Sequence, residues 1–523
     1  MNKKFDLVLK NGFIIDGTGC PGYYSDIGIS GDRIYTISTG LYGKEEISAE
    51  GLIITPGFID IHTHSEQSLL CNSRAESKIT QGVTLEVLGN CGSSSAPVPP
   101  KLISRIEKTL WRDYEIKLNW STVADYIAKL SEKGVALNYY FLVGHSNLRY
   151  LVDALGENIT KSQLSEMQMI LRSILRSREA GGLSTGLIYP PSCFASTEEL
   201  IALARVLAEE DALYTSHIRD EGDKLESAIE EAITIGREGG VVVEISHLKA
   251  SGKRNWGKVE KAISCILEAR KEGVKVFADA YPYLAGATGL SAVLPKEVFN
   301  EGKEVAKQRL KEDREKLISY LNPRDDWEGI IVSEVSRRDW QGRSIKELAY
   351  DMGKTPQEFV IDLLLEEDLE VGAIFFSMCQ EDVDRVITTS FVSIGSDSVT
   401  SSPTGILSKS RPHPRTYGTF PKFFNYYVKE KKLLTLQEAV RKVTSMPAYV
   451  LGLKERGKVE EGYFADLTVF SLDNLKDTAT YSNPHSFSIG IEWVLVNGIP
   501  VIANGKFTDK LPGREVKREK AFK

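Results

Sequence analysis

The most constraining feature of this sequence is a long central region in which short apolar segments alternate with amphipathic ones. This alternation is typical of a parallel β-sheet covered by helices, because each parallel strand needs a crossover before the next. Eight such units fit a closed (β/α)₈ barrel, so we predict an α/β fold with a TIM-type barrel. The predicted strands are Phe58–His64, Val83–Leu88, Leu137–Val143, Gly182–Leu187, Leu213–His217, Val241–His247, Val274–Tyr281 and Val392–Asp397.

Two further segments, Ile330–Val335 and Ala373–Met378, have the same apolar character, so ten candidate strands compete for eight barrel positions. The charge-dense run Lys296–Asp326 is helical in composition and too long for an ordinary barrel loop. We therefore expect an inserted subdomain over residues 286–348, with a solvated helical excursion as the alternative.

Short β-strand patterns separated by Gly and Asp turns occur at both ends of the chain. Phe5–Ile15 and Arg33–Ile37 lie near the start, and Asp466–Phe470 and Ile491–Val496 lie near the end. Because chain termini often lie close together, we expect residues 1–55 and 451–512 to form one small β domain beside a barrel over residues 56–450. Two unrelated β appendages are the alternative. The mostly charged residues 513–523 are expected to be a frayed tail.

Composition excludes several classes of protein. Lys and Arg total 65 against 72 Asp and Glu, a formal net charge of −7, which argues against binding to nucleic acid or to an anionic membrane. The longest uncharged apolar stretch, Gly51–Ile59, is far shorter than the roughly 20 residues of a membrane span. Six cysteines without a CxxC pair do not suggest a disulfide framework, and the start of the chain shows no secretory pattern. We expect a soluble, cytoplasmic protein.

Residue types that bind metals gather at the carboxyl ends of the predicted strands. Six of them end or closely follow a strand: His62, His64, Cys91, His217, His247 and Asp397. Side chains two positions apart in a strand share one face, so the two histidines of GFIDIHTH point the same way. In a (β/α)₈ barrel the carboxyl ends of the strands share one rim, where active sites are built.

Each of these residues alone has a structural explanation, since a lone histidine is often hydrogen-bonded in a core and a free cysteine is usually a small hydrophobe. Four of the seven histidines occupy strand ends, however, which makes chance placement a poor explanation. Imidazole, thiolate and carboxylate are ligands of zinc or a similar divalent ion, and sulfur favours zinc. His145, His413 and His485 are left outside this ligand set.

Ten segments form a recognisable set along the chain. They are TPGFIDIHTH (55–64), GNCG (89–92), STGLIYPP (184–191), SHIRDEG (216–222), EISHLK (244–249), DAYPYLAG (279–286), GSDS (395–398), HPRTYGTFP (413–421), EGYFADLTVF (461–470) and VLVNG (494–498). In these segments the sequence resembles the N-acyl-D-amino-acid deacylases, or D-aminoacylases, of the amidohydrolase superfamily, nearly from end to end. The resemblance implies a (β/α)₈ barrel, a small β-sandwich made by both chain ends, an inserted subdomain and a zinc site at the barrel rim.

The resemblance also implies roles for the metal ligands. Cys91, His217 and His247 would hold one tightly bound zinc. His62, His64 and Asp397 would surround a second, weaker site that Cys91 can bridge, in place of the carboxylated lysine of many superfamily members. A carboxylate beside the metal can take a proton from water and deliver one to the leaving amine, and Asp397 is the candidate for this catalytic role.

The product amino acid carries a carboxylate that must be neutralised. By resemblance Lys249, Tyr281 and Arg415 would bind this carboxylate, and Tyr189 would orient the substrate. Surface ion pairs are the alternative for the two cations, and core packing is the alternative for the two tyrosines. The family often has Ser where this chain has Ala287, so a hydrogen bond of about 0.5–1.5 kcal/mol would be missing.

The predicted function is therefore zinc-dependent hydrolysis of N-acyl-D-amino acids to a carboxylate and a free D-amino acid. The expected partner is a small-molecule N-acyl amino acid, with no nucleic acid and no membrane, and the sequence carries no signal for the oligomeric state. One alternative is a cyclic amide hydrolase of the hydantoinase or dihydroorotase kind, whose site would resemble a carboxylated-lysine centre. The other is a catalytically inactive scaffold.

Overall fold

Eight parallel strands form a barrel at the centre of the structure, a computed structural model that describes residues 4–519. Their order is β16-β12-β11-β10-β9-β8-β7-β6, and a bridge between Thr63 and Ser398 joins the ends of the first and last strands. The strands are β6 (Phe58–Asp60), β7 (Val83–Leu88), β8 (Asn138–Gly144), β9 (Gly182–Gly186), β10 (Leu213–His217), β11 (Val242–Ile245), β12 (Val276–Ala280) and β16 (Val392–Ile394). Each falls on one of the eight predicted strands, so the predicted α/β barrel is confirmed.

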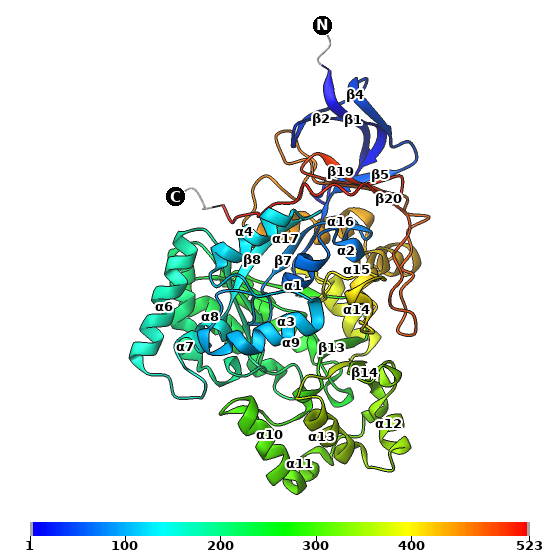
Figure 1. The fold of residues 1–523 in the computed structure, drawn as a ribbon. Helices are drawn as coiled ribbons and strands as arrows, with labels where there is room; N and C mark the ends of the chain where they lie inside the picture. The colour runs from blue at the N-terminus through cyan, green and yellow to red at the C-terminus, as the bar shows by residue number, and fades with distance from the viewer. Residues whose placement is uncertain (1–3, 520–523) are drawn as a thin grey trace.

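Helices cover the outside of this barrel (Figure 1). They are α1 (Glu66–Cys71), α2 (Glu76–Ile79), α3 (Ile103–Tyr114), α4 (Val123–Lys133), α5 (His145–Leu151), α6 (Lys161–Arg176), α7 (Thr197–Glu209), α8 (Leu225–Gly239), α9 (Val259–Lys271), α14 (Gln380–Thr388), α15 (Arg415–Phe423), α16 (Leu436–Val443) and α17 (Ser445–Leu451). Helix α7 illustrates how the sequence fixes the start of a helix. The Ser196 side chain accepts a hydrogen bond from the Glu199 backbone N–H and so caps the first turn. Among residues 4–519, no helix is long and apolar enough to cross a membrane.

The two extra candidate strands belong to a separate sheet between β12 and β16. In it β15 (Gly372–Phe376) pairs with both β13 (Ala285–Gly289) and β14 (Ile330–Glu334). With α10 (Lys303–Glu312), α11 (Arg314–Leu321), α12 (Ile345–Asp351) and α13 (Pro356–Glu366), these strands surround a hydrophobic core of their own. This unit, the insertion, lies at the bottom of Figure 1. It extends past residue 348, where we expected it to end, because its central strand β15 comes later.

The two ends of the chain meet in one nine-stranded sheet at the top of Figure 1. Its strands are β1 (Phe5–Ile14), β2 (Tyr23–Ser30), β3 (Arg33–Ser38), β4 (Gly43–Ser48), β5 (Ile53–Pro56), β17 (Leu467–Phe470), β18 (Ile491–Val496), β19 (Ile499–Ala503) and β20 (Lys506–Phe507). The junction is the antiparallel pair β5–β17, in which Ile54 lies opposite Val469. A separate core that includes Ile14, Ile27 and Leu467 holds the two halves together.

Residues 513–519 are not frayed, in contrast to the prediction. Gly513 bridges Val135, Glu515 bridges Tyr139, and the side chain of Val516 is buried. The segment is ordered because its backbone pairs with that of Val135, just before β8, and of Tyr139 within β8. The remainder of the predicted tail, residues 520–523, lies outside the described residues.

A buried ion-pair network joins the first and last barrel strands. Lys78 of α2 is fully buried, and its Nζ lies 2.8 Å from Asp60 at the end of β6. The same Nζ donates to Ser396 (2.6 Å) and Ser398 (3.0 Å), which follow β16. Glu86 of β7 lies 3.3 Å away, and burial raises the pKa of its carboxyl to about 7. One ammonium group thus connects three strands.

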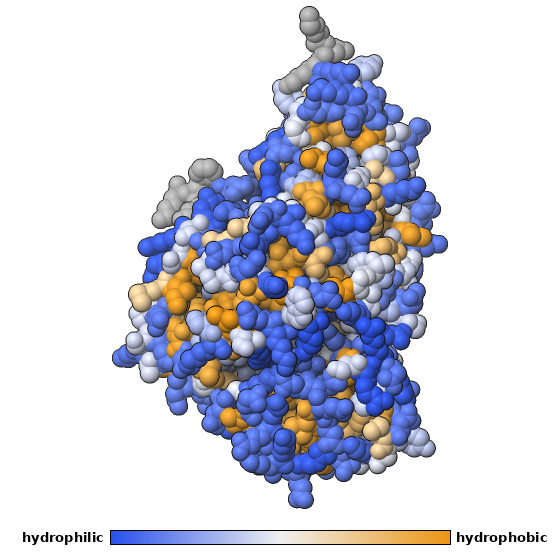
Figure 2. Space-filling view, in the orientation of Figure 1, coloured by the Kyte–Doolittle hydropathy of each residue, from blue (hydrophilic) through white to orange (hydrophobic). Residues whose placement is uncertain are grey.

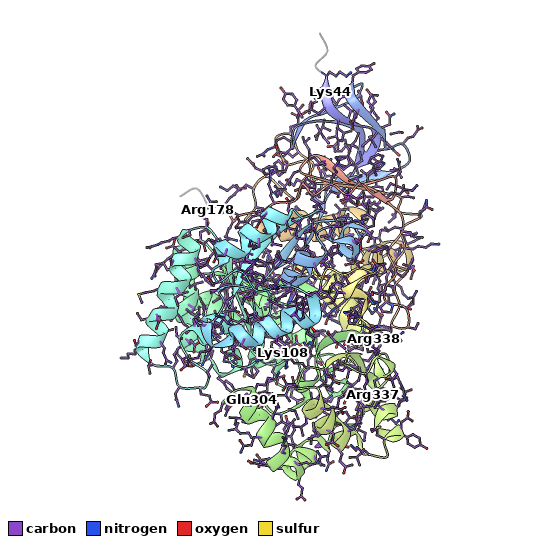
Figure 3. The ribbon with its side chains drawn as sticks, viewed as in Figure 1. Lys44, Lys108, Arg178, Glu304, Arg337 and Arg338 are labelled. Carbon is purple, nitrogen blue, oxygen red and sulfur yellow. The ribbon has the colours of Figure 1, made fainter. Side chains whose placement is uncertain are left out.

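We expect Lys78→Met to lower the free energy of unfolding by about 3–5 kcal/mol, because loss of the cation leaves buried carboxyl groups unpaired. Lys44, labelled in Figure 3, is a matched control because it pairs with Asp6 at 2.7 Å on the surface. Lys44→Met should barely change the denaturation midpoint, since exposed ion pairs contribute little. The measurement is unfolding by denaturant, and equal midpoints for the two variants would contradict the prediction.

A second buried lysine predicts a dependence of stability on pH. Lys442 of α16 is fully buried, its Nζ donates to the carbonyl of Val392 at 2.8 Å, and burial lowers its pKa from 10.5 to about 7. Between these two pH values the unfolded chain binds more protons at this site than the folded chain. Stability should therefore rise with pH across this window, by up to about 1.4 kcal/mol per pH unit, with the site least favourable below pH 7. Denaturation at pH 7, 8 and 9 should show a smaller rise for Lys442→Met than for the unchanged protein, and identical slopes would refute the assignment.

Candidate metal centre

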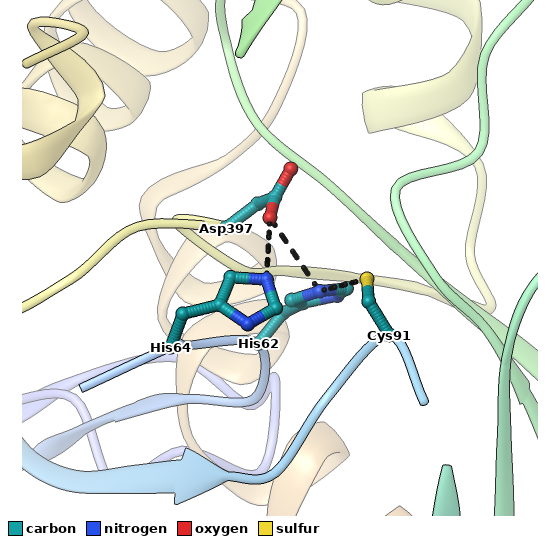
Figure 4. A group of neighbouring side chains, drawn as sticks. All are labelled: His62, His64, Cys91 and Asp397. Atoms are coloured by element: carbon teal, nitrogen blue, oxygen red, sulfur yellow. Dashed lines mark hydrogen bonds and ion pairs between the residues drawn. The ribbon is translucent and has the colours of Figure 1, made fainter. Parts of the chain in front are cut away.

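The six predicted ligand residues converge at the carboxyl-end rim of the barrel. They form two groups in which the potential ligand atoms lie within 4.8 Å of one another: His62, His64, Cys91 and Asp397 in one, and Cys91, His217 and His247 in the other. Figure 4 shows the first group. Cys91 belongs to both groups, so its sulfur lies between two potential ion positions.

The distances around Cys91 fit a tetrahedral metal ion. Its Sγ lies 3.6 Å from His217 Nδ1 and 3.6 Å from His247 Nε2. Ligands that surround a zinc ion at its usual bond lengths are separated by about 3.4–3.7 Å. All three side chains are buried, and a thiolate with two imidazoles is a donor set that suits zinc. These residues therefore fit one tightly held ion.

Asp397 completes the second group. Its Oδ1 lies 3.1 Å from His64 Nε2 and 3.6 Å from His62 Nε2, the two contacts drawn as dashed lines from Asp397 in Figure 4. Its Oδ2 lies 2.9 Å from Arg415 Nη1. Burial alone would raise the pKa of this carboxyl. The Arg415 guanidinium and the neighbouring histidines outweigh burial and hold the pKa well below its ordinary value. The carboxylate is therefore ionised, as both a ligand and a proton acceptor must be.

The backbone is unusual at three of these residues. Cys91, His247 and Asp397 have φ angles of 53°, 36° and 49°, in the left-handed region that non-glycine residues rarely adopt and that clusters at functional sites. The turn that carries Cys91 also packs directly on the end of β9, since a Cβ on Gly186 would lie 2.1 Å from the Cys91 carbonyl oxygen. A glycine is therefore required at this close approach.

Two carboxylates that we did not predict hold the imidazoles in place. Asp279 Oδ2 lies 3.0 Å from His62 Nδ1, and its Oδ1 accepts the backbone N–H of His247 at 2.9 Å. Glu221 Oε1 lies 2.8 Å from His247 Nδ1. A histidine that gives one nitrogen to a metal needs its other nitrogen oriented, which is the function of such partners. Both residues lie within the segments SHIRDEG and DAYPYLAG, so a search for acids beside the histidines could have found them.

The structure places three of the predicted substrate-binding residues, Lys249, Tyr281 and Tyr189, on the wall of one cavity of about 1740 Å³. Lys249 Nζ lies 2.5 Å from Glu221 Oε1, so its charge is already partly balanced. The Tyr189 hydroxyl lies 2.9 Å from Thr288 Oγ1. The buried Tyr281 hydroxyl has no hydrogen-bond partner within residues 4–519. This side of the cavity therefore offers a cation and a donor that lacks a partner.

Arg415, the fourth predicted substrate-binding residue, already forms an ion pair within the protein. It is the first residue of α15, is 3% exposed, and pairs with Asp397. Its Cζ lies 4.6 Å from the centre of the Tyr281 ring, and its Nη2 donates to the Ala287 carbonyl at 3.4 Å. A substrate carboxylate at this guanidinium would have to share it with Asp397.

The three histidines left out of the ligand set make hydrogen bonds away from this cluster. His145 contacts Glu199 at 2.9 Å, His413 contacts Tyr481 at 3.2 Å, and His485 contacts Tyr417 at 3.0 Å. The structural explanation that applies to a lone histidine therefore accounts for these three.

Comparison with known proteins gives matches over nearly the whole chain. Two models, each described as an amidohydrolase family, match residues 53–244 and 392–502. The D-aminoacylase of Alcaligenes xylosoxydans xylosoxydans is 35% identical over 99% of each chain.

The crystal structure of N-acyl-D-glutamate deacylase from Bordetella bronchiseptica, complexed with zinc and a phosphonate inhibitor, has a TM-score of 0.83 at 33% identity and covers 99% of this chain and 100% of that chain. A D-aminoacylase structure described with a binuclear metal centre has the same TM-score at 34% identity and covers 98% and 100%. A D-hydantoinase from a Bacillus species covers 98% of this chain and 99% of its own, but at 15% identity and a TM-score of 0.58 it shares the fold alone.

The chain has a parallel barrel with a cluster of potential metal ligands at its rim, and its sequence matches the amidohydrolase models. These features define a metal-dependent amidohydrolase. The chain is an enzyme of that class. Because the likeness to D-aminoacylase extends over 99% of both chains, it belongs to the D-aminoacylase family.

We expect His217→Ala to lose its tightly bound metal and Asp397→Ala to retain it, because the two residues lie in different groups around Cys91. The measurement is zinc content by mass spectrometry after dialysis, with circular dichroism to show that both variants are folded. Equal metal content in the two folded variants would contradict the ligand assignment.

Proposed function

We propose that this protein is a zinc-dependent deacylase that hydrolyses N-acyl-D-amino acids to a carboxylate and a free D-amino acid. The observation that carries the proposal is the position of Cys91, whose sulfur is shared by two groups of ligands in a chain that is 35% identical to a D-aminoacylase. Zinc would be held by Cys91, His217 and His247. His62, His64 and Asp397 would surround a second divalent ion.

Bound zinc would supply a Lewis acid that makes water a better nucleophile and polarises the amide carbonyl. The protein would supply the proton transfers through Asp397, whose ionised carboxylate lies among His62, His64 and Arg415. A carboxylate in this position can accept the proton of the attacking water and pass one to the leaving nitrogen. Burial of the site strengthens each of these electrostatic interactions.

Lys249, Tyr281 and Arg415 would bind the carboxylate of the amino acid, and Tyr189 would orient the substrate. Lys249 and Tyr281 support this because they line the cavity beside the metal centre. Arg415 supports it less directly, since its present partner is Asp397. Ala287 lines the same cavity without a hydroxyl, so this chain would make one hydrogen bond fewer to the carboxylate than a relative with Ser.

Two alternatives are less well supported. A cyclic amide hydrolase would carry a carboxylated lysine at the bridge, where this chain has Cys91. An inactive scaffold would not need six polar side chains gathered into two potential ligand groups, with His62 and His247 oriented by Asp279 and Glu221. The cytoplasmic location stays a prediction from the sequence.

The direct test is incubation of the zinc-loaded protein with the N-acetyl derivatives of one amino acid in its D and L forms. We expect release of the free amino acid from the D form only, and a loss of about 10²–10⁴-fold in kcat for Asp397→Asn, since a general acid–base contributes that much. Hydrolysis of the L form alone or of neither form, or faster opening of a hydantoin, would contradict the proposal.

A further inference from the structure

The residues that line the cavity come from sides of the barrel that lie across from one another. Lys249 follows β11 and Tyr281 follows β12, so two of the three predicted carboxylate contacts line one side of the cavity. In the strand order of the closed barrel, β7 and β8 lie opposite β11 and β12. The acyl chain and the amino acid leave an amide carbonyl in opposite directions. A substrate whose carboxylate lies at β11 and β12 therefore points its acyl chain toward β7 and β8.

The cavity wall on that side is formed by α3, which follows β7. Leu102, just before the helix, and Ile106, Leu110 and Tyr114 within it recur at intervals of four residues and line the cavity, beside the polar Arg105, Thr109 and Asp113. Side chains four apart lie on one face of a helix, so these residues form a continuous apolar stripe. At 1.5 Å per residue the stripe extends for about 18 Å. An acetyl group has a single methyl to place against it.

The insertion supplies the facing wall. Val293 and Leu321, from its hydrophobic core, and Phe375 of β15 line the same cavity. Glu370, just before β15, pairs with Arg112 of α3 and so joins this helix to the insertion. In Figure 3, the label Lys108 marks α3 of the barrel and the label Glu304 marks α10 of the insertion. Figure 2 shows apolar side chains over the part of the barrel where α3 lies, above an insertion whose surface is mostly hydrophilic.

The size of the cavity supports an extended ligand. Its volume of about 1740 Å³ exceeds the ~300–1,000 Å³ of typical small-molecule sites. An acetylated amino acid is smaller than the ligands that fill such sites, so much of the space beside α3 would be left to water. Each methylene that moves from water onto an apolar wall can strengthen binding by up to about fourfold.

We propose that the α3 side of the cavity binds an apolar acyl chain, and that the enzyme prefers N-acyl-D-amino acids whose acyl chain is longer than acetyl. This inference rests on the proposed deacylase function and adds the substrate class. The acyl chain lies between the stripe on α3 and the wall of the insertion, and the chemistry at the metal centre is the same for every chain length.

The test compares the N-acetyl, N-butanoyl and N-octanoyl derivatives of one D-amino acid with the zinc-loaded full chain. We expect kcat/KM to rise with chain length and to be at least about tenfold higher for octanoyl than for acetyl, mainly through KM. A ratio of one or less, with acetyl turned over, would overturn the acyl proposal and leave the deacylase function standing. Failure to hydrolyse any of the three would overturn the function itself.

Two isoleucines of the same helix provide matched variants. Ile106 lines the cavity, whereas Ile103 is 40% exposed and, within the described chain, is not among the residues around it. Ile106→Gln should lower the octanoyl-to-acetyl ratio of kcat/KM at least fivefold, and Ile103→Gln should leave it unchanged. Because both changes replace an isoleucine of α3 with the same polar residue, a general effect on the helix would appear in both. Equal ratios in the two variants would overturn the proposal.

Discussion

A fully buried lysine closes the barrel at the place where the metal centre is built. Lys78 lies between Asp60, after which the first strand ends, and the two serines that flank Asp397 after the last strand. The Asp60 carboxylate also accepts the backbone N–H of Ser396. This closure brings Asp397 within 3.1 Å of His64, 333 positions earlier in the chain. Without it the carboxylate and the imidazoles would belong to opposite edges of an open sheet.

Two further carboxylates contact the imidazoles of the candidate centre. Asp279 and Glu221 each contact an imidazole nitrogen that faces away from the Cys91 sulfur. The arrangement fixes which ring nitrogen is available to a metal, and it balances charge in a buried site. The left-handed backbone of Cys91, His247 and Asp397 shows that the rim is shaped for this convergence at the cost of backbone strain.

The barrel strands differ in role from the insertion and α3, which extend beyond the rim. The barrel rim carries the six clustered side chains that the proposed function uses as metal ligands and proton acceptor. The insertion and α3 enclose the space above the rim, where the ion pair between Arg112 and Glu370 joins them. In the proposed function the strand ends therefore supply the chemistry, and the elements beyond them contact the acyl chain.

The local sequence was sufficient to predict the barrel strands and the six residues that gather at the rim, because a buried parallel strand must be apolar and its end must face the rim. The same apolar pattern also described Ile330–Val335 and Ala373–Met378, and only long-range pairing places them in the sheet of the insertion. Tertiary structure alone likewise pairs Arg415 with Asp397, orders Gly513 to Val516 against β8, and brings Glu221 to His247. Sequence periodicity predicts which face of a helix or strand is buried. The partner of a charged side chain, or of an unpaired backbone N–H or C=O group, instead depends on which distant part of the chain lies beside it.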